Sequence, residues 1–246
     1  GFQKFMVDNS YFLELYFLTR AVQEGGGRAR VFIPYLGYSR ADKIEKRGEP
    51  NRLKVVAGLF AGLKIKPRIL DIHNAASLRF FKGAKIESAL PLLAGAIKNI
   101  VSNKADLIVV APDYGARDRA KQFAKYLGIS KVMVIRKKRI GRQVRFGKIT
   151  TDLKGKTVII VDDILDTGST LYGAAKIVKN LGASRVLAAV VHGMFSGTAL
   201  KNFKKSKIDK LYVTNSLYHR RLPTKIKALD LSNLLPRYKK ATGVSP

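Results

Sequence analysis

Short apolar runs alternate along the chain with longer segments in which apolar residues recur at helical spacing. Several of the runs are rich in valine and isoleucine, which is typical of strands buried on both faces of a parallel sheet. Strands and helices that alternate in this order predict βαβ units and therefore an α/β fold. The expected strands span residues 29–36, 67–72, 106–111, 131–135, 157–161, 185–192 and 210–214. The expected helices span 5–22, 51–63, 84–101, 119–128, 171–182 and 231–240, and the one at 84–101 is interrupted or begins near Pro91.

The same pattern indicates two lobes. A strand that ends near an acidic residue and enters a polar loop occurs around Asp71, Asp113 and Asp162, which hints at an internal duplication. We expect an N-terminal lobe over residues 1–85 and a more complete C-terminal lobe over residues 86–246. A chain of 246 residues that is 46% hydrophobic is large enough for a packed core.

The segment 156–171, KTVIIVDDILDTGSTL, has the pattern of a phosphate site. Its apolar strand delivers Asp162 and Asp163 to the carboxyl end of an α/β sheet, where ligands bind. The following loop precedes a helix, so its backbone N–H groups and hydroxyls would face a bound anion. The two acids would then face sugar hydroxyls or a metal. The loop consists of Asp166, Thr167, Gly168, Ser169 and Thr170.

Helix capping is the simpler explanation for this loop, because Asp, Ser and Thr are common capping residues. A cap accounts for one or two of them. It does not account for two adjacent carboxylates after an apolar strand, where an unpaired charge would be costly. We therefore favour the phosphate site.

Two further loops carry similar chemistry. In APDYGARDR, residues 111–119, Asp113 and Gly115 stand at a predicted strand–helix junction, with Arg117 or Arg119 available for pyrophosphate oxygens. Helix starts with Asp and Arg are common, so this loop gains weight only from the similar site at 156–171. Asp71 and His73 lie two residues apart at a strand end and could face one side toward a metal–nucleotide, although a lone histidine is more often structural.

Charge is the least usual property of the composition. The chain has 47 Lys and Arg against 17 Asp and Glu, a formal net charge of +30. This excess fits contact with nucleic acid or attraction of phosphorylated small molecules. A generally lysine-rich surface without a dedicated partner would give the same number. Contact with RNA or a ribonucleoprotein therefore stays open.

Cysteine is absent, which excludes disulfides and thiolate metal sites. No apolar segment reaches the roughly 20 residues needed to span a bilayer, and the N-terminal stretch reads as an amphipathic helix with no signal peptide. We expect no membrane partner and an intracellular location, in the cytoplasm or an organelle.

Taken together, the motifs resemble the ribose-phosphate pyrophosphokinases, also called phosphoribosyl pyrophosphate synthetases. The likeness covers nearly the whole chain, and the order of the motifs makes it specific. A phosphoribosyltransferase would explain only the second lobe. The matching segments are IPYLGYSRAD (33–42), DIHNAASLRFF (71–81), APDYGARDRAK (111–121), VDDILDTGSTL (161–171), HGMFSGTAL (192–200) and VTNSL (213–217).

The resemblance implies two type-I phosphoribosyltransferase-like lobes with parallel sheets flanked by helices. It also implies a homo-oligomer and Mg²⁺-dependent transfer of the diphosphate of ATP to ribose 5-phosphate, which gives phosphoribosyl pyrophosphate and AMP. By position, the implied site residues are Arg40, Asp42 and His73 toward ATP; Asp71, His73 and Asp113 toward the metal; Asp113, Gly115 and Arg117 toward pyrophosphate; Asp162, Asp163 and Asp166 to Thr170 toward ribose 5-phosphate; and Lys137 and Arg139 at the reaction.

The sequence also departs from the family pattern. Ala41, Ala116 and Ser169 replace a glutamine and two glycines. The match begins part-way into the first lobe, which has either lost its initial strands or continues before Gly1. These differences and the high charge favour an alternative, in which the chain is a catalytically reduced homologue that serves as a basic, RNA-associated structural subunit. The retained acids Asp162, Asp163 and Asp166 speak against it because they would repel RNA.

Overall fold

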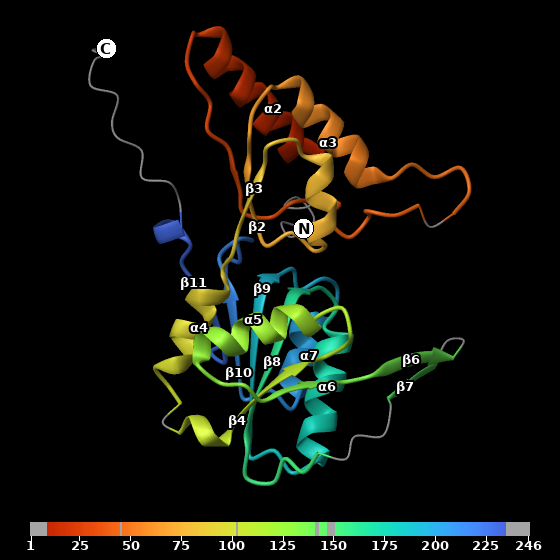
Figure 1. Cartoon of the computed structure of the whole chain (residues 1–246), viewed down its shortest axis with the longest axis vertical. Coiled ribbons are helices and arrows are strands. Elements are labelled where there is room, and N and C mark those ends of the chain that lie inside the picture. The colour runs from red at the N-terminus through yellow and green to blue at the C-terminus, as the bar shows by residue number, and fades with distance from the viewer. Residues whose placement is uncertain (1–8, 45, 102, 141–142, 147–150, 235–246) are drawn as a thin grey trace.

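The computed structural model describes residues 9–44, 46–101, 103–140, 143–146 and 151–234, with the backbone alone at residues 9, 10, 137–140 and 143–146. It contains a small N-terminal sheet above a larger one (Figure 1). The small sheet has three parallel strands in the order β1 (Phe32–Ile33), β2 (Arg68–Leu70) and β3 (Lys85–Glu87). Helices α2 (Asn9–Glu24) and α3 (Arg52–Gly62) share a hydrophobic core with this sheet. A 3₁₀ helix at Ala75–Phe80 follows β2. Buried Leu53, Phe60 and Ile69 belong to its core.

The larger sheet has six parallel strands in the order β11-β10-β9-β8-β4-β5. Nearly every residue of β4 and β9 is buried, because helices cover both faces of the sheet. The strands are β4 (Leu107–Ala111), β5 (Val132–Val134), β8 (Thr157–Leu165), β9 (Arg185–Gly193), β10 (Lys210–Thr214) and β11 (Ile226–Leu229).

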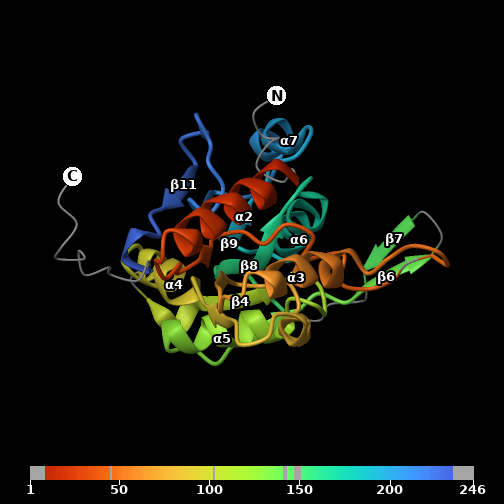
Figure 2. The same ribbon diagram turned by 90° about the horizontal axis from the view of Figure 1, so that it is seen from above.

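Two helices pack on each face of this sheet, as the two views show (Figures 1 and 2). On one face, α4 (Leu90–Lys98) and α5 (Arg117–Leu127) share a core with Val109, Val161 and Leu187. On the other face, α6 (Ser169–Asn180) and α7 (Ala199–Lys205) share a core with the intervening strand residues. Each element therefore buries its apolar side against the sheet.

The strand order reverses between β4 and β8. From β4 the chain passes through α5 to β5 on one side, whereas β8 lies on the other side of β4 and continues through α6 and α7 to β9 and β10. In open α/β sheets such a reversal leaves a crevice at the carboxyl ends of the two strands, and ligands bind there. Asp113, in the loop after β4, and Asp162 and Asp163, near the carboxyl end of β8, reach this crevice.

Several predicted elements need correction. The helix predicted within residues 84–101 begins at Leu90, so its expected start near Pro91 is confirmed, and proline is well tolerated in a first turn. The first part of the range forms strand β3 instead. Strand β8 runs on to Leu165, so Asp162 and Asp163 lie within a strand. The basic segment after β5 forms an antiparallel ribbon of β6 (Lys137–Ile140) and β7 (Gln143–Phe146), which extends away from the sheet (Figure 1).

Both α7 and β11 were missed by the sequence pattern. Of the predicted helix at 231–240, a 3₁₀ turn at Ser232–Leu234 is present, and the remainder lies outside the described residues. Strand β3 crosses the predicted lobe boundary at residue 85, so the division into lobes stays a prediction. Within the described ranges, no helix is long and apolar enough to cross a membrane.

His192, at the carboxyl end of β9, ties the two sheets together. Its Nδ1 lies 2.9 Å from Ser216 Oγ, and its Nε2 lies 3.3 Å from the carbonyl oxygen of Asp71, which follows β2. The ring of Tyr35 from the N-terminal part packs edge-on against the imidazole, with the ring centroids 5.1 Å apart. The imidazole is almost completely buried, and burial lowers the pKa of His192 to about 4.

This environment predicts an acid-sensitive fold. Between pH 6.5 and about 4 the unfolded chain binds a proton at His192 that the folded chain excludes, so the free energy of unfolding falls as the pH drops through this window. At neutral pH the lowered pKa of His192 corresponds to about 3 kcal/mol of the free energy of unfolding, which is lost as the pH falls to about 4. We expect urea unfolding of His192→Gln, which keeps an N–H donor, to show a flatter pH dependence than the unsubstituted protein. Parallel pH profiles for the two proteins would contradict this assignment.

Candidate active site

A cavity of about 870 Å³ lies between the two sheets at the carboxyl ends of β4 and β8. Its lining combines residues that are more than 100 positions apart in the sequence. Most of the predicted site residues line it: Arg40, Asp42, Asp71, His73, Asp113, Gly115, Asp162, Asp163 and Asp166 to Thr170. The fold therefore brings together the loops that the sequence analysis had singled out separately.

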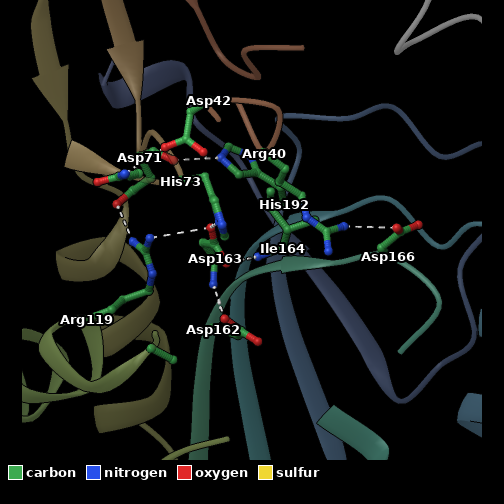
Figure 3. Close-up of polar contacts among 12 residues, drawn as sticks. Arg40, Asp42, Asp71, His73, Arg119, Asp162, Asp163, Ile164, Asp166 and His192 are labelled. Carbon is green, nitrogen blue, oxygen red and sulfur yellow. Dashed lines mark hydrogen bonds and ion pairs between the residues drawn. The ribbon is translucent and has the colours of Figure 1, made fainter. Parts of the chain in front are cut away.

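Arg119, on α5, points into the cavity toward two carboxylates, those of Asp71 and Asp163 (Figure 3). Its Nη1 lies 3.5 Å from Asp71 Oδ1, and its Nη2 lies 3.6 Å from Asp163 Oδ2. Only 16% of the Arg119 side chain is exposed, and the two carboxylates are more deeply buried. One guanidinium thus joins the carboxyl ends of β2 and β8. A charge pair this far from water is costly to break, because the remaining partner would stay buried and uncompensated.

Asp71 adopts a strained backbone conformation, with φ of +40° at a residue other than glycine. Its carboxylate accepts a hydrogen bond from the backbone N–H of Ala89 at 2.6 Å. Burial raises the pKa of Asp71, although this N–H and Arg119 oppose the rise. Backbone strain that persists at a buried acid is characteristic of functional sites.

The neighbouring acids Asp162 and Asp163 have opposite electrostatic environments. Burial, together with repulsion from Asp163, raises the pKa of Asp162 well above its usual range. Burial also acts on Asp163, but a hydrogen bond with His73 Nδ1 and the charge of Arg119 prevail and lower its pKa. Asp163 is therefore the ionised member of the pair at neutral pH, and Asp162 holds its proton more strongly.

The loop from Asp166 to Thr170 enters α6 without a side-chain cap. The N-cap position is Gly168, with φ of +81°, and this residue has no side chain that could accept a hydrogen bond from the first turn. The capping explanation of this loop is therefore wrong for its N-cap residue. Asp166 instead pairs with Arg40, with Arg40 Nη1 3.0 Å from Asp166 Oδ2. This ion pair joins the N-terminal part to the loop.

Tyr172 supports the same loop from behind. Its ring fills the space next to Gly168 so closely that a Cβ atom on that residue would overlap it. The Tyr172 hydroxyl donates a hydrogen bond to the carbonyl oxygen of Ala199 at 3.0 Å, and its ring lies 6.3 Å from that of Phe203, measured between centroids. Gly168 is thus required both for its backbone angle and for this close approach.

On the first-lobe side, Asp42 is held by two donors. Its Oδ2 accepts hydrogen bonds from Asn74 Nδ2 at 2.7 Å and from Ser77 Oγ at 2.9 Å. Although burial opposes ionisation, these bonds lower the pKa of Asp42. The segment around residue 42 and the segment after β2 therefore form one hydrogen-bonded wall of the cavity.

The loop after β4, for which the sequence predicts pyrophosphate binding, differs in part from the expectation. Asp113 lines the cavity, and its Oδ1 accepts a hydrogen bond from the backbone N–H of Ala116 at 3.3 Å. Arg117 does not line it, because its guanidinium pairs with Asp118 at 2.9 Å and stacks on the Tyr114 ring. Of the two arginines that the sequence offered, Arg119 is the one that faces the cavity.

The side chains of two predicted catalytic residues are not described by the structure. Lys137 and Arg139 lie on β6, and their side chains are outside the described part of the chain. Within the described residues, no three His, Cys, Asp or Glu side chains are grouped so that they could hold a metal ion, so Asp71, His73 and Asp113 are not a preformed three-ligand set. His192 and Tyr172 were missed, because a buried histidine or tyrosine in an apolar stretch carries no local signal of function.

Comparison with known proteins defines the class of this chain. Residues 84–223 match the model of the phosphoribosyl transferase domain. Together with the parallel sheets flanked by helices, this match confirms the predicted α/β class and a type-I phosphoribosyltransferase-like fold.

Named relatives make the family specific. The chain is 35% identical over 225 residues to a ribose-phosphate pyrophosphokinase of Pyrococcus furiosus, covering 91% of this chain and 77% of the relative. It is 32% identical to the enzyme of that name from Thermotoga maritima, with 92% and 73% covered. The crystal structure of a phosphoribosylpyrophosphate synthetase from Mycobacterium smegmatis matches with a TM-score of 0.79 and 29% identity over 92% of this chain and 75% of that one. The chain belongs to the ribose-phosphate pyrophosphokinase family.

Gly168→Ala tests the packing of the loop behind the cavity. Because the sequence analysis assigns this loop to ribose 5-phosphate, we expect the variant to bind that sugar phosphate about tenfold more weakly: the added methyl group must displace the Tyr172 ring, and each 1.4 kcal/mol of lost binding is a factor of ten. Isothermal titration measures the affinity. Gly155→Ala is the matched control: Gly155 also has a positive φ, of +72°, but an added Cβ meets nothing within 4 Å. Equal losses in the two variants would show that backbone strain alone, and not Tyr172, accounts for the effect.

Proposed function

We propose that this chain is an active, Mg²⁺-dependent ribose-phosphate pyrophosphokinase that transfers the diphosphate of ATP to ribose 5-phosphate. The observation that carries the proposal is the assembly of all the described candidate loops around one cavity, on both sides of the Arg119 network. A phosphoribosyltransferase would use the second lobe alone. It would leave the first-lobe wall, with Arg40, Asp42 and His73, without a role.

The sugar phosphate has a suitable place at α6. The uncapped N-terminus of this 12-residue helix and the hydroxyls of Thr167, Ser169 and Thr170 suit the 5-phosphate. Asp162 and Asp163 stand beside the loop and would accept hydrogen bonds from the ribose hydroxyls. Asp163, which is held ionised by His73 and Arg119, is the stronger acceptor of the two.

ATP would lie across the cavity, against the first-lobe wall. Arg40, Asp42 and His73 line this side, and Asp113 and Gly115 line the loop that we assign to pyrophosphate. Arg40 would exchange its exposed ion pair with Asp166 for a phosphate oxygen, which costs little because exposed ion pairs are weak.

The donors in the cavity suit Mg²⁺. This ion prefers oxygen ligands and is usually held by one or two carboxylates with substrate phosphates and water, so a preformed three-ligand cluster is not needed. Asp71, Asp113 and His73 line the cavity and remain the proposed metal-side residues, with Asp113 the carboxylate that is not ion-paired to Arg119. Bound there, Mg²⁺ would neutralise charge on the transferred diphosphate.

Phosphoryl-type transfer depends mainly on how the two substrates are positioned and on how the charge of the transferred group is neutralised. The 1-hydroxyl oxygen of ribose 5-phosphate forms a bond to the β-phosphorus of ATP, and its proton is released to solvent. The bond between the β-phosphorus and the oxygen that bridges to the α-phosphorus breaks, and AMP leaves with that oxygen. We assign Lys137 and Arg139 to stabilising the charge that develops on the transferred group. They occupy alternate positions of β6, with Lys138 between them.

AMP formation tests the proposal. With Mg²⁺ and ATP, we expect AMP release that depends on ribose 5-phosphate, and a loss of about 10²-fold or more in kcat for Lys137→Ala, since a lost charge-stabilising donor typically costs that much. Lys138→Ala is the matched control on the same strand and should change the rate far less. No ribose 5-phosphate-dependent AMP, or a Lys137→Ala variant with an unchanged rate, would show that the assignment is wrong.

A further inference from the structure

The acidic residues are unevenly distributed between the cavity and the rest of the chain. Seven of the 17 acids but only three of the 47 lysines and arginines line the cavity, which leaves ten acids and 44 cations elsewhere in the chain. The seven are Asp42, Asp71, Asp113, Asp118, Asp162, Asp163 and Asp166. The surface away from the cavity is therefore even more basic than the net charge of +30 indicates.

One part of this surface is particularly rich in cations. Between residues 199 and 227 the sequence has nine lysines and arginines and a single acid, Asp209. That acid is engaged elsewhere: it accepts a hydrogen bond from the backbone N–H of Val186 at 2.7 Å and lies 3.5 Å from Lys179 Nζ. Eight of the nine are exposed, and one of these, Lys227, lies on strand β11. We define the basic face by the other seven: Lys201, Lys204, Lys205, Lys207, Arg220, Arg221 and Lys225.

The members of the basic face lie on one side of the six-stranded sheet. Helix α7 packs its Phe203 into the core that it shares with α6. The connection from β10 to β11, residues 215–225, packs Leu222 on the same core. His219 in this connection lies against Phe195, just before α7, with the ring centroids 5.0 Å apart. This ring contact links the two basic segments, and both pack on the face of the sheet opposite α4 and α5, where Figure 2 shows α7.

None of the seven side chains forms an ion pair with a described acidic residue. An exposed aromatic residue, Tyr218, precedes Arg220 and Arg221 in the same connection, with 65% of its surface accessible. Cations that follow a phosphate backbone and an exposed ring on which a base stacks are the two components of single-strand recognition. A bilayer surface fits less well, because α7 has only seven residues and buries Ala199 and Phe203.

We propose that the basic face binds single-stranded RNA, independently of the proposed transfer reaction. Lys204, Lys205 and Lys207 contact phosphates, and Tyr218 stacks on a base. Unpaired, accessible bases are the usual targets of proteins that bind RNA loops and ends. The face lies outside the cavity, so its occupation leaves the Arg119 network and the phosphate loop untouched.

Fluorescence anisotropy with the full chain and a labelled, unstructured 20-nucleotide RNA tests the proposal across a range of KCl concentrations. The triple variant Lys204→Ala, Lys205→Ala, Lys207→Ala should bind at least about tenfold more weakly, with a salt slope shallower by about 2, since each phosphate contact on a single strand contributes about 0.7. Tyr218→Ala should lower affinity and leave the slope unchanged. Thermal melts establish that each variant is folded.

The matched control removes three exposed lysines from the opposite face, by Lys98→Ala, Lys121→Ala and Lys125→Ala. It has the same formal charge as the triple variant, and its affinity should change by about twofold or less. Equal weakening in both variants would show that net charge, and not this face, attracts the RNA. Displacement by ATP would place the RNA in the cavity. Binding of anionic phosphatidylserine vesicles in preference to the RNA, or no binding at all, would equally overturn the proposal.

Discussion

The buried guanidinium of Arg119 is the interaction on which the cavity depends. It stands between Asp71 after β2 and Asp163 in β8, and these carboxylates belong to different sheets. His73 adds a second bond to Asp163, and His192 holds the carbonyl oxygen of Asp71. Each of these groups would be destabilising if it were buried alone. Paired across the junction, they fix the strained Asp71 and the two walls of the cavity relative to each other.

The position of the network follows from the order of the strands. Because the order of the strands reverses between β4 and β8, the carboxyl ends of these parallel strands open into a crevice that the small sheet covers. The helix after β4 supplies Arg119, and β8 itself supplies Asp162 and Asp163. The same reversal sends α6 and α7 to the other face, where Tyr172 supports the phosphate loop. Charge is thereby divided between an acidic cavity and a basic exterior.

Much of this arrangement could be predicted from the sequence. Strands such as β4 and β9 are buried on both faces and therefore read as continuous apolar runs, and the loops at their ends carried the chemistry. Edge strands β3 and β11 were missed because they are short and partly exposed, with Lys85, Glu87 and Lys227 among their residues. The partners of Arg119 and His192 could not be predicted, because they lie 24 or more positions away and are brought close only by the fold. The choice of Arg119 over Arg117 likewise depended on the direction that each position of α5 faces.

A double-mutant cycle on Arg119→Gln and Asp71→Asn tests the central claim most directly. The free energies of unfolding of the two single variants and of the double variant, from urea titration at pH 7, give the coupling between the two side chains. Residues in one buried network typically show coupling of about 0.5–3 kcal/mol, and we predict a value of at least about 1 kcal/mol in favour of the pair. Additive effects, with coupling near zero, would show that Arg119 does not hold the two sheets together and would contradict the account.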